Sequence, residues 1–185
     1  KNPYARARMT ITTDTIPYLY ESVKNIVELG FKLIAMAVDI FDKKWNDKIK
    51  DQYLIQVSRI KDEYGRNPNL HIGVIERNNI KKLASCGGGK DSVHISVDGK
   101  FYPCSYGVGV KEFIIGNLEE GIFEEKVKEI ESIGQHTSSV CKGCTIYDFC
   151  PGTRCKIINK IVSGNYDVPS IATCMDMNVR INVLY

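Results

Sequence analysis

Hydrophobic positions in the first 76 residues follow two different periods. Apolar runs typical of strands occupy residues 6–12, 31–38 and 71–75. Between Thr13 and Gly30, and again over residues 47–64, apolar side chains recur three or four positions apart, as in amphipathic helices. On the second of these helices the expected apolar side consists of Ile49, Tyr53, Ile55, Val57 and Ile60. The pattern predicts β-α-β-α-β, and therefore a parallel α/β sheet with right-handed crossovers.

The nearly continuous apolar run over residues 31–38 predicts a strand that is buried on both faces of the sheet. Three strands are too few to close a barrel or to shield both edges of a sheet. The chain also opens on Lys1-Asn2-Pro3, without Met, and reaches its first strand almost at once. We therefore expect the chain to be the C-terminal part of a longer protein.

The pattern changes after Lys82. A glycine-rich loop at residues 85–89 matches neither of the common phosphate-binding motifs, so we do not expect a phosphate site there. Asp98-Gly99 lies between two strand-like runs and predicts a β-hairpin with a two-residue turn. Helices are expected over residues 122–133 and 155–162, with a turn at residues 163–166. The second half of the chain is therefore predicted to be a small α+β domain.

Composition places few further limits on function. A chain of 185 residues is long enough for two small domains, which we expect at residues 1–82 and 83–185. The net charge is +3 without a basic stripe, so no nucleic-acid partner is expected. The sequence also contains no apolar run long enough to span a membrane.

The cysteines are the strongest chemical signal in the sequence. All seven follow residue 85, and four form the series Cys141-x2-Cys144-x5-Cys150-x4-Cys155. An odd count and long helical stretches without cysteine disfavour a disulfide framework. Structural zinc and iron–sulfur clusters both bind thiolates at such spacings, and spacing alone does not separate them.

The complete cysteine pattern resembles the SPASM domain, the C-terminal auxiliary iron–sulfur domain of many radical S-adenosylmethionine (SAM) enzymes. The series begins Cys86-x12-Gly99-x4-Cys104, continues with the four cysteines above and ends at Cys174. The chain departs from the family in one place, since four residues separate Cys150 from Cys155 where three are usual. Upstream, β-α-β-α-β is similar to the last strands of the radical SAM partial barrel.

The resemblance implies two auxiliary [4Fe–4S] clusters. The first would use Cys86, Cys104 and Cys155, and the second would use Cys141, Cys144, Cys150 and Cys174. Residues 80–85 contain no cysteine, so the fourth iron of the first cluster would be open or bound by another ligand, including a substrate thiolate. Asp91, His94 and Tyr106 are near in sequence, although a histidine on an alternating strand is usually an ordinary strand residue.

The resemblance also implies an activity for the parent protein, a radical SAM maturase. In that family a reduced cluster cleaves SAM to a 5′-deoxyadenosyl radical, which removes hydrogen from a peptide or protein side chain. The auxiliary clusters anchor the substrate or relay electrons, for example during thioether cross-linking of a ribosomal peptide or in sulfatase maturation. The radical SAM motif C-x3-C-x2-C is absent from this sequence, so SAM and a third [4Fe–4S] cluster would belong to the parent and the chain alone would be inactive.

Several expectations remain open at this point. Arg6, Arg8 and Met36 either face the barrel interior near SAM or are ordinary strand residues, and no catalytic residue is identified. Expected partners are a peptide or protein substrate and a reductant such as flavodoxin or ferredoxin, in the reducing cytoplasm that free thiolates require. The alternatives are a zinc-stabilised binding module and an electron-transfer module without SAM chemistry.

Overall fold

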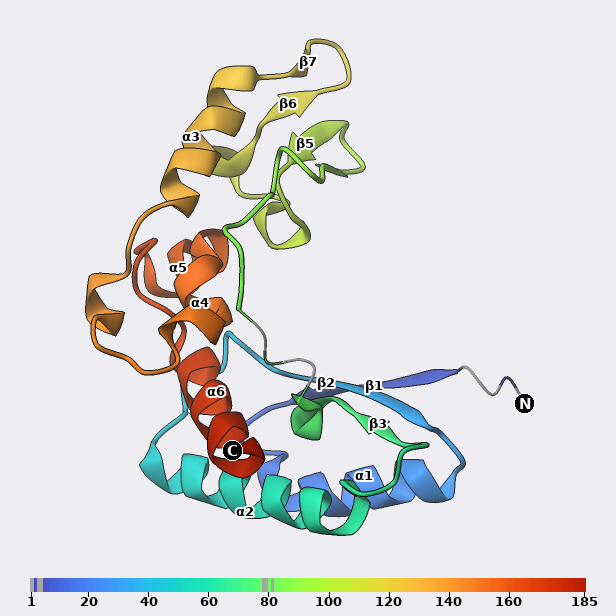
Figure 1. Ribbon diagram of the computed structural model, residues 1–185. Helices are drawn as coiled ribbons and strands as arrows, with labels where there is room; N and C mark the ends of the chain where they lie inside the picture. The colour runs from blue at the N-terminus through green and yellow to red at the C-terminus, as the bar shows by residue number, and fades with distance from the viewer. Residues whose placement is uncertain (1, 3–4, 78–79, 81) are drawn as a thin grey trace. The chain divides into compact units, whose positions relative to one another are not determined.

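A computed structural model describes residues 2, 5–77, 80 and 82–185, and it divides into two compact units (Figure 1). The first unit comprises Lys1–Lys81 together with Ile171–Tyr185, and the second comprises Lys82–Ser170. No helix among the described residues is both long enough and apolar enough to cross a membrane.

The first unit is a parallel α/β structure. Its elements are β1 (Arg6–Ile11), η1 (Ile16–Tyr18), α1 (Leu19–Glu28), β2 (Leu33–Val38), α2 (Asp47–Tyr64), β3 (His71–Ile72), η2 (Gly73–Ile75) and α6 (Ile171–Leu184). β1 and β3 both pair in parallel with β2, which lies between them. The predicted β-α-β-α-β order is confirmed, although β3 is shorter than expected because the chain turns into η2 at Gly73.

Local signals in the sequence account for the helix boundaries. The Asn46 side chain accepts a hydrogen bond from the Ile49 backbone N–H at 3.1 Å and so caps the start of α2. After α1, Gly30 adopts a φ of +90°, a left-handed conformation that glycine enters at little cost. The Gly30 N–H donates to the Val27 carbonyl oxygen at 2.8 Å, which ends the helix.

The core of the first unit lies between the sheet and its helices. Figure 1 shows α1 and α2 side by side beneath the strands. The buried side chains come from β1, α1, β2, α2, β3 and α6: Ile11, Leu19, Val23, Ile34, Tyr53, Val57, Ile60, Ile72, Ala172, Val179 and Val183. The prediction that Ile55 belongs to the core is wrong, because this residue is 58% exposed. It lies two residues from both Tyr53 and Val57 and therefore projects from the opposite side of α2.

β2 is buried on one face rather than on both. Ile34, Met36 and Val38 pack against the helical core, whereas Leu33 and Ala35 border an open hollow of about 400 Å³ on the other face. The prediction of a strand buried on both faces is therefore wrong for this unit. Residues 31–38 are mostly apolar, as the sequence shows, but Leu33 and Ala35 border the hollow and are only half-buried.

The sequence pattern predicts no helix in the tail, yet residues Ile171–Leu184 form α6. Its buried side chains complete the core of the first unit. A polar group helps to fix the helix there, since the Tyr53 hydroxyl donates to Asp176 Oδ1 at 2.8 Å. Arg180 Nη2 also donates to the Gly73 carbonyl oxygen at 3.0 Å. α6 is thus an integral part of the first unit.

The second unit is a small α+β structure, as predicted. Its strands are β4 (His94–Ile95), β5 (Lys100–Tyr102), β6 (Gly116–Asn117) and β7 (Gly121–Ile122), which pair antiparallel in that order. Its helices are α3 (Glu124–Gly134), α4 (Pro151–Arg154) and α5 (Lys156–Ser163). Short 3-10 turns are η4 (Ser105–Gly107), η5 (Lys111–Phe113), η6 (Ser139–Cys141) and η7 (Tyr147–Phe149). The unit's apolar core contains Tyr102, Phe113, Ile115, Ile130 and Ile157.

The hairpin predicted from Asp98-Gly99 is present between β4 and β5, but its loop is longer than two residues. The last pair of the ladder is Ile95 with Phe101. Beyond it, the Ser96 N–H donates to Lys100 O and the Gly99 N–H donates to Ser96 O, both at 2.9 Å. Gly99 has a φ of +75°, so the loop is a turn followed by a glycine bulge.

Candidate metal centres

Three of the predicted ligand cysteines lie near one another in the second unit. Cys86 precedes the glycine loop, Cys104 follows β5, and Cys155 immediately precedes α5. Burial raises the pKa of the Cys155 thiol to about 11, an N–H from Ile158 opposes this rise, and the neighbouring Cys86 and Cys104 thiols add to it. The three residues assigned to the first cluster are therefore near enough to influence one another electrostatically.

The glycine loop explains how Cys86 comes close to the end of β5. A Cβ atom added at Gly88 would lie 2.8 Å from the Pro103 carbonyl oxygen, which is too close for any residue other than glycine. The Gly88 N–H also donates to Cys86 Sγ at 3.4 Å. Gly88 thus allows the loop that carries Cys86 to lie close to the chain just before Cys104, and its N–H points toward the Cys86 sulfur.

A cavity of about 200 Å³ lies beside these thiols within the second unit. Its walls are formed by Leu83, Ala84, Cys86, Pro151, Arg154 and Cys155. The segment that carries Leu83 is tied in place, since the Leu83 N–H donates to the Asp148 carbonyl oxygen at 2.9 Å. Cys86 and Cys155 therefore both line this cavity.

The Cys141–Cys144 segment forms a tight turn. The Cys144 N–H donates to the Cys141 carbonyl oxygen at 3.0 Å, and Gly143 has a φ of +83°. Cys150 is buried immediately before α4, and its carbonyl oxygen accepts a hydrogen bond from Thr153 Oγ1 at 2.9 Å. The turn is typical of cysteine knuckles, which hold two sulfurs on one side of the chain.

Cys174 lies on a different unit from the other predicted ligands. It is an exposed residue of α6, and Asn178 Nδ2 donates to its carbonyl oxygen at 2.8 Å. The second set of ligands therefore takes Cys141, Cys144 and Cys150 from one unit and Cys174 from the other. Its assembly stays a prediction.

The thiol set of Cys86, Cys104 and Cys155 fits an iron–sulfur group in its donor chemistry. Cys86 and Cys155 each accept a backbone N–H at sulfur, an arrangement that stabilises thiolate and sulfide charge. Across residues 2, 5–77, 80 and 82–185, no three His, Cys, Asp or Glu side chains form a group with the geometry to hold a metal ion. The three thiols are thus neighbours, two of them beside a cavity, and do not form a closed ion site.

The other residues near the glycine loop have ordinary positions. His94 is exposed on β4, and Tyr106 is about half exposed in η4. Asp91 lies against the loop, where its backbone N–H donates to the Gly87 carbonyl oxygen at 2.7 Å. Of these three residues, Asp91 is the one that the structure places against the loop that carries Cys86.

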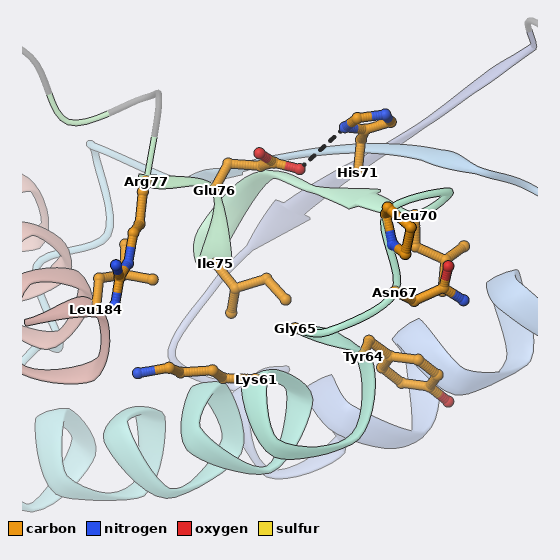
Figure 2. A pocket seen from close by; sticks show the side chains of 11 residues that line it. Lys61, Tyr64, Gly65, Asn67, Leu70, His71, Ile75, Glu76, Arg77 and Leu184 are labelled. Carbon is orange, nitrogen blue, oxygen red and sulfur yellow. Dashed lines mark hydrogen bonds and ion pairs between the residues drawn. The ribbon is translucent and has the colours of Figure 1, made fainter.

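A further pocket, of about 430 Å³, lies in the first unit and was not predicted (Figure 2). Lys61 and Tyr64 of α2 form one side, and His71 Nδ1 lies 3.2 Å from Glu76 Oε1 on the other. The pocket is lined both by His71, the first residue of β3, and by residues 75–77, which follow the strand. It contains none of the predicted ligand cysteines, so it is a separate candidate site.

The strand residues considered for SAM binding divide between the two faces of the sheet. Met36 packs against the helical core and is an ordinary core residue. Arg6 lines the hollow on the opposite face together with Leu33 and Ala35, and Arg8 is exposed.

Comparison with known families identifies the class of the second unit. Residues 86–145 match SPASM, described as an iron–sulfur cluster-binding domain. This range includes the first two cysteines, the glycine at residue 99 and the Cys141–Cys144 turn. This part of the chain is therefore similar to an iron–sulfur cluster-binding domain of the SPASM type, in agreement with the resemblance seen in the sequence. No curated protein matches the chain.

Solved structures extend the likeness to both parts of the chain. Native anSMEcpe with bound AdoMet matches at a TM-score of 0.66 and 16% identity, covering 95% of this chain and 53% of that one. Native anSMEcpe with bound AdoMet and Cp18Cys peptide matches at a TM-score of 0.66 and 18% identity, covering 95% and 54%. The chain thus spans about half the length of these structures, and at such identity the likeness establishes the fold. The predicted similarity to radical SAM/SPASM-domain proteins is confirmed.

Proposed function

We propose that this chain is part of a radical SAM maturase and that its cysteines bind two auxiliary [4Fe–4S] clusters. Cys86, Cys104 and Cys155 would hold the first cluster, and Cys141, Cys144, Cys150 and Cys174 would hold the second. The observation that carries the proposal is that Cys155 interacts electrostatically with Cys86 and Cys104 and shares a cavity wall with Cys86, although 69 positions separate Cys86 from Cys155 in the sequence.

When bound, such clusters supply one-electron transfer and an iron site for a further ligand. The chain's own residues bind and shield the group. The backbone N–H groups of Gly88 and Ile158 donate to the Cys86 and Cys155 sulfurs and so help to orient them. Leu83, Ala84 and Pro151 form apolar walls of the adjoining cavity.

The first cluster would have three cysteine ligands, which leaves one position for another group. The cavity beside Cys86 and Cys155 gives a small ligand room to approach. We propose a cysteine thiolate of a peptide or protein substrate as this ligand, in a parent enzyme that forms thioether cross-links on ribosomal peptides. A similar structure described with a bound Cp18Cys peptide supports a peptide substrate. A sulfatase-maturing activity is the alternative, and flavodoxin or ferredoxin would supply electrons.

The proposal is tested by measuring iron and zinc in protein that is purified without air, together with its absorbance spectrum. Two clusters predict about eight irons per chain and broad visible absorbance. Near-stoichiometric zinc without visible absorbance would overturn the proposal and favour the zinc-stabilised module, for which the Cys141–Cys144 turn is the supporting observation.

Single substitutions assign each cluster to its ligands. Cys104→Ala is expected to remove about half of the iron, and Cys144→Ala the other half, because each cluster contains about four irons. Ser105→Ala is the matched control for the first variant, since it changes the neighbouring residue without removing a thiol. If both cysteine variants keep the full iron content, the assignment is wrong.

A further inference from the structure

Arg154 is held firmly at one end of its side chain. Its Nη2 donates to Asp148 Oδ1 at 3.1 Å, and its Cζ lies 5.4 Å from the centre of the Tyr147 ring. The Asp148 backbone is fixed in turn, because its carbonyl oxygen accepts the Leu83 N–H. The guanidinium therefore has a defined position beside the cavity that Arg154 lines with Cys86 and Cys155.

A second nitrogen of this side chain, Nε, has no acceptor among the described residues. Arg154 Nε is buried and makes no hydrogen bond to any part of the chain that the structure describes. A buried guanidinium N–H without an acceptor is unfavourable, and guanidinium groups remain charged at all ordinary pH values. The guanidinium, which is paired with Asp148, thus has one buried N–H without an acceptor. Arg154 lines the cavity together with Cys86 and Cys155.

We propose that Arg154 is a positioning residue for the group bound by Cys86, Cys104 and Cys155, and that its Nε–H donates a hydrogen bond to a sulfur of that group. This inference rests on the proposed function. Net charge and hydrogen bonds to sulfur set the reduction potentials of iron–sulfur clusters. A fixed positive donor stabilises the form that has gained an electron, so Arg154 raises the reduction potential of the first cluster.

A purely structural role for Arg154 makes a different prediction. Arg154 pairs with Asp148, as Lys82 Nζ does at 3.5 Å, so either residue could hold the chain segments together. Lys82 has an exposed side chain and does not line the cavity. Lys82→Met therefore removes one positive charge that is paired with Asp148, as Arg154→Met does, but it removes no hydrogen-bond donor from the cavity wall. It is the matched control.

The test is a redox titration of the reconstituted chain under anaerobic conditions, with a chemical reductant such as dithionite as the electron source. Cys104→Ala, which disables the first set of ligands, identifies the transition that belongs to the first cluster. Arg154→Lys keeps the charge and removes Nε, whereas Arg154→Met removes both. Iron per chain is measured for every variant, so that the loss of a cluster is distinguished from a change in its potential.

Both Arg154 variants are expected to keep their iron and to lower the equilibrium constant for one-electron reduction of the first cluster by about tenfold, or about 59 mV. The Lys82→Met variant is expected to match the wild type. An unchanged potential in both Arg154 variants, at full iron content, would overturn the inference and leave the proposed function intact. A shift in Lys82→Met as large as that in Arg154→Met would also overturn it, because the effect would then come from distant charge. A wild-type chain that binds no iron would instead refute the proposed function.

Discussion

The two units of this chain are held together in different ways. The first has a continuous apolar core between a parallel sheet and α1, α2 and α6, and Thr13 is its buried polar residue among those that the structure describes. The second has a small apolar core and buries several polar side chains, which are Ser138, Thr153, Lys156, Asn159 and Ser170. The first unit therefore relies mainly on hydrophobic packing, whereas the second relies more on polar contacts, to which the clusters that we propose for its thiols would add.

Removal of the iron–sulfur clusters that we propose is expected to have the largest effect, and to affect the units unequally. A group bound only by the folded state stabilises it by about 4 kcal/mol when its free concentration is a thousand times the dissociation constant. We expect chelation to increase amide hydrogen exchange in β4–β7 by at least about a hundredfold, while exchange in α2 stays unchanged. Equal loss of protection in both regions would show that the units do not differ in this way.

Truncation of the first core is expected to have the next largest effect. Ile60 is fully buried in α2, so Ile60→Ala should lower the free energy of unfolding of the first unit by about 4 kcal/mol. Ile55→Ala is the control on the same helix, since Ile55 is exposed, and it should change the stability by less than about 0.5 kcal/mol. Urea denaturation followed by circular dichroism measures both, and similar losses would contradict the assigned core.

A buried ion pair tests the polar character of the second unit. Lys156 is 2% exposed, and its Nζ lies 2.7 Å from Asp167 Oδ1. Asp167→Asn leaves the buried ammonium without its counter-charge and should cost about 3 kcal/mol. Lys156→Met places an apolar chain in the same space and should cost less than about 1 kcal/mol, because it removes the buried charge itself. Thermal unfolding of the two variants measures the asymmetry, and a larger loss from Lys156→Met would contradict it.

The smallest expected effect concerns the β4–β5 hairpin. A hydrogen bond from Lys100 and another from Ser96 lower the pKa of Asp98 to about 2. Because the pKa of Asp98 is lowered in the folded state, its ionised carboxylate stabilises the fold at pH values above the ordinary aspartate pKa, and this stabilisation is lost as the pH falls through about 2. The contribution is small because the site is exposed. NMR titration of the Asp98 carboxyl should therefore give a midpoint near 2, and Lys100→Met should raise it.

Repeating this titration without metal sharpens the comparison between the units. If local turn chemistry forms the hairpin, the Asp98 midpoint stays low in the metal-free chain. A midpoint at the ordinary value for aspartate would show instead that the hairpin needs the bound group.

Much of the fold was predictable where the two faces of an element differ in polarity. α2 was found because its apolar positions recur on one side, and the hairpin because glycine follows aspartate. α6 was missed because buried residues lie around much of its circumference, including Ala172, Met177 and Leu184, so that its periodicity is weak. The early end of β3 was also unpredictable, since it depends on Gly73 lying so close to β2 that an added Cβ would be 3.0 Å from the Met36 nitrogen.

The candidate site was predictable where chemistry alone identifies a residue. Thiols at regular spacings indicate metal ligands, and the SPASM match confirms that class of domain. Arg154 gave no such signal, because an arginine beside a cysteine has many ordinary roles. Its importance depends on the position of Asp148 and on a cavity wall shared with Cys86, which come from the folded structure.

The place of α6 in the chain has a consequence for biosynthesis. Domains of a nascent chain usually fold in order from the amino terminus as the ribosome releases them. Here Ala172, Val179 and Val183 belong to the core of the first unit, yet they are translated after the whole of the second unit. The first unit is therefore translated first but is completed only when α6 has been synthesised. Until then, the nascent chain exposes an unfilled hydrophobic groove that chaperones would be expected to recognise.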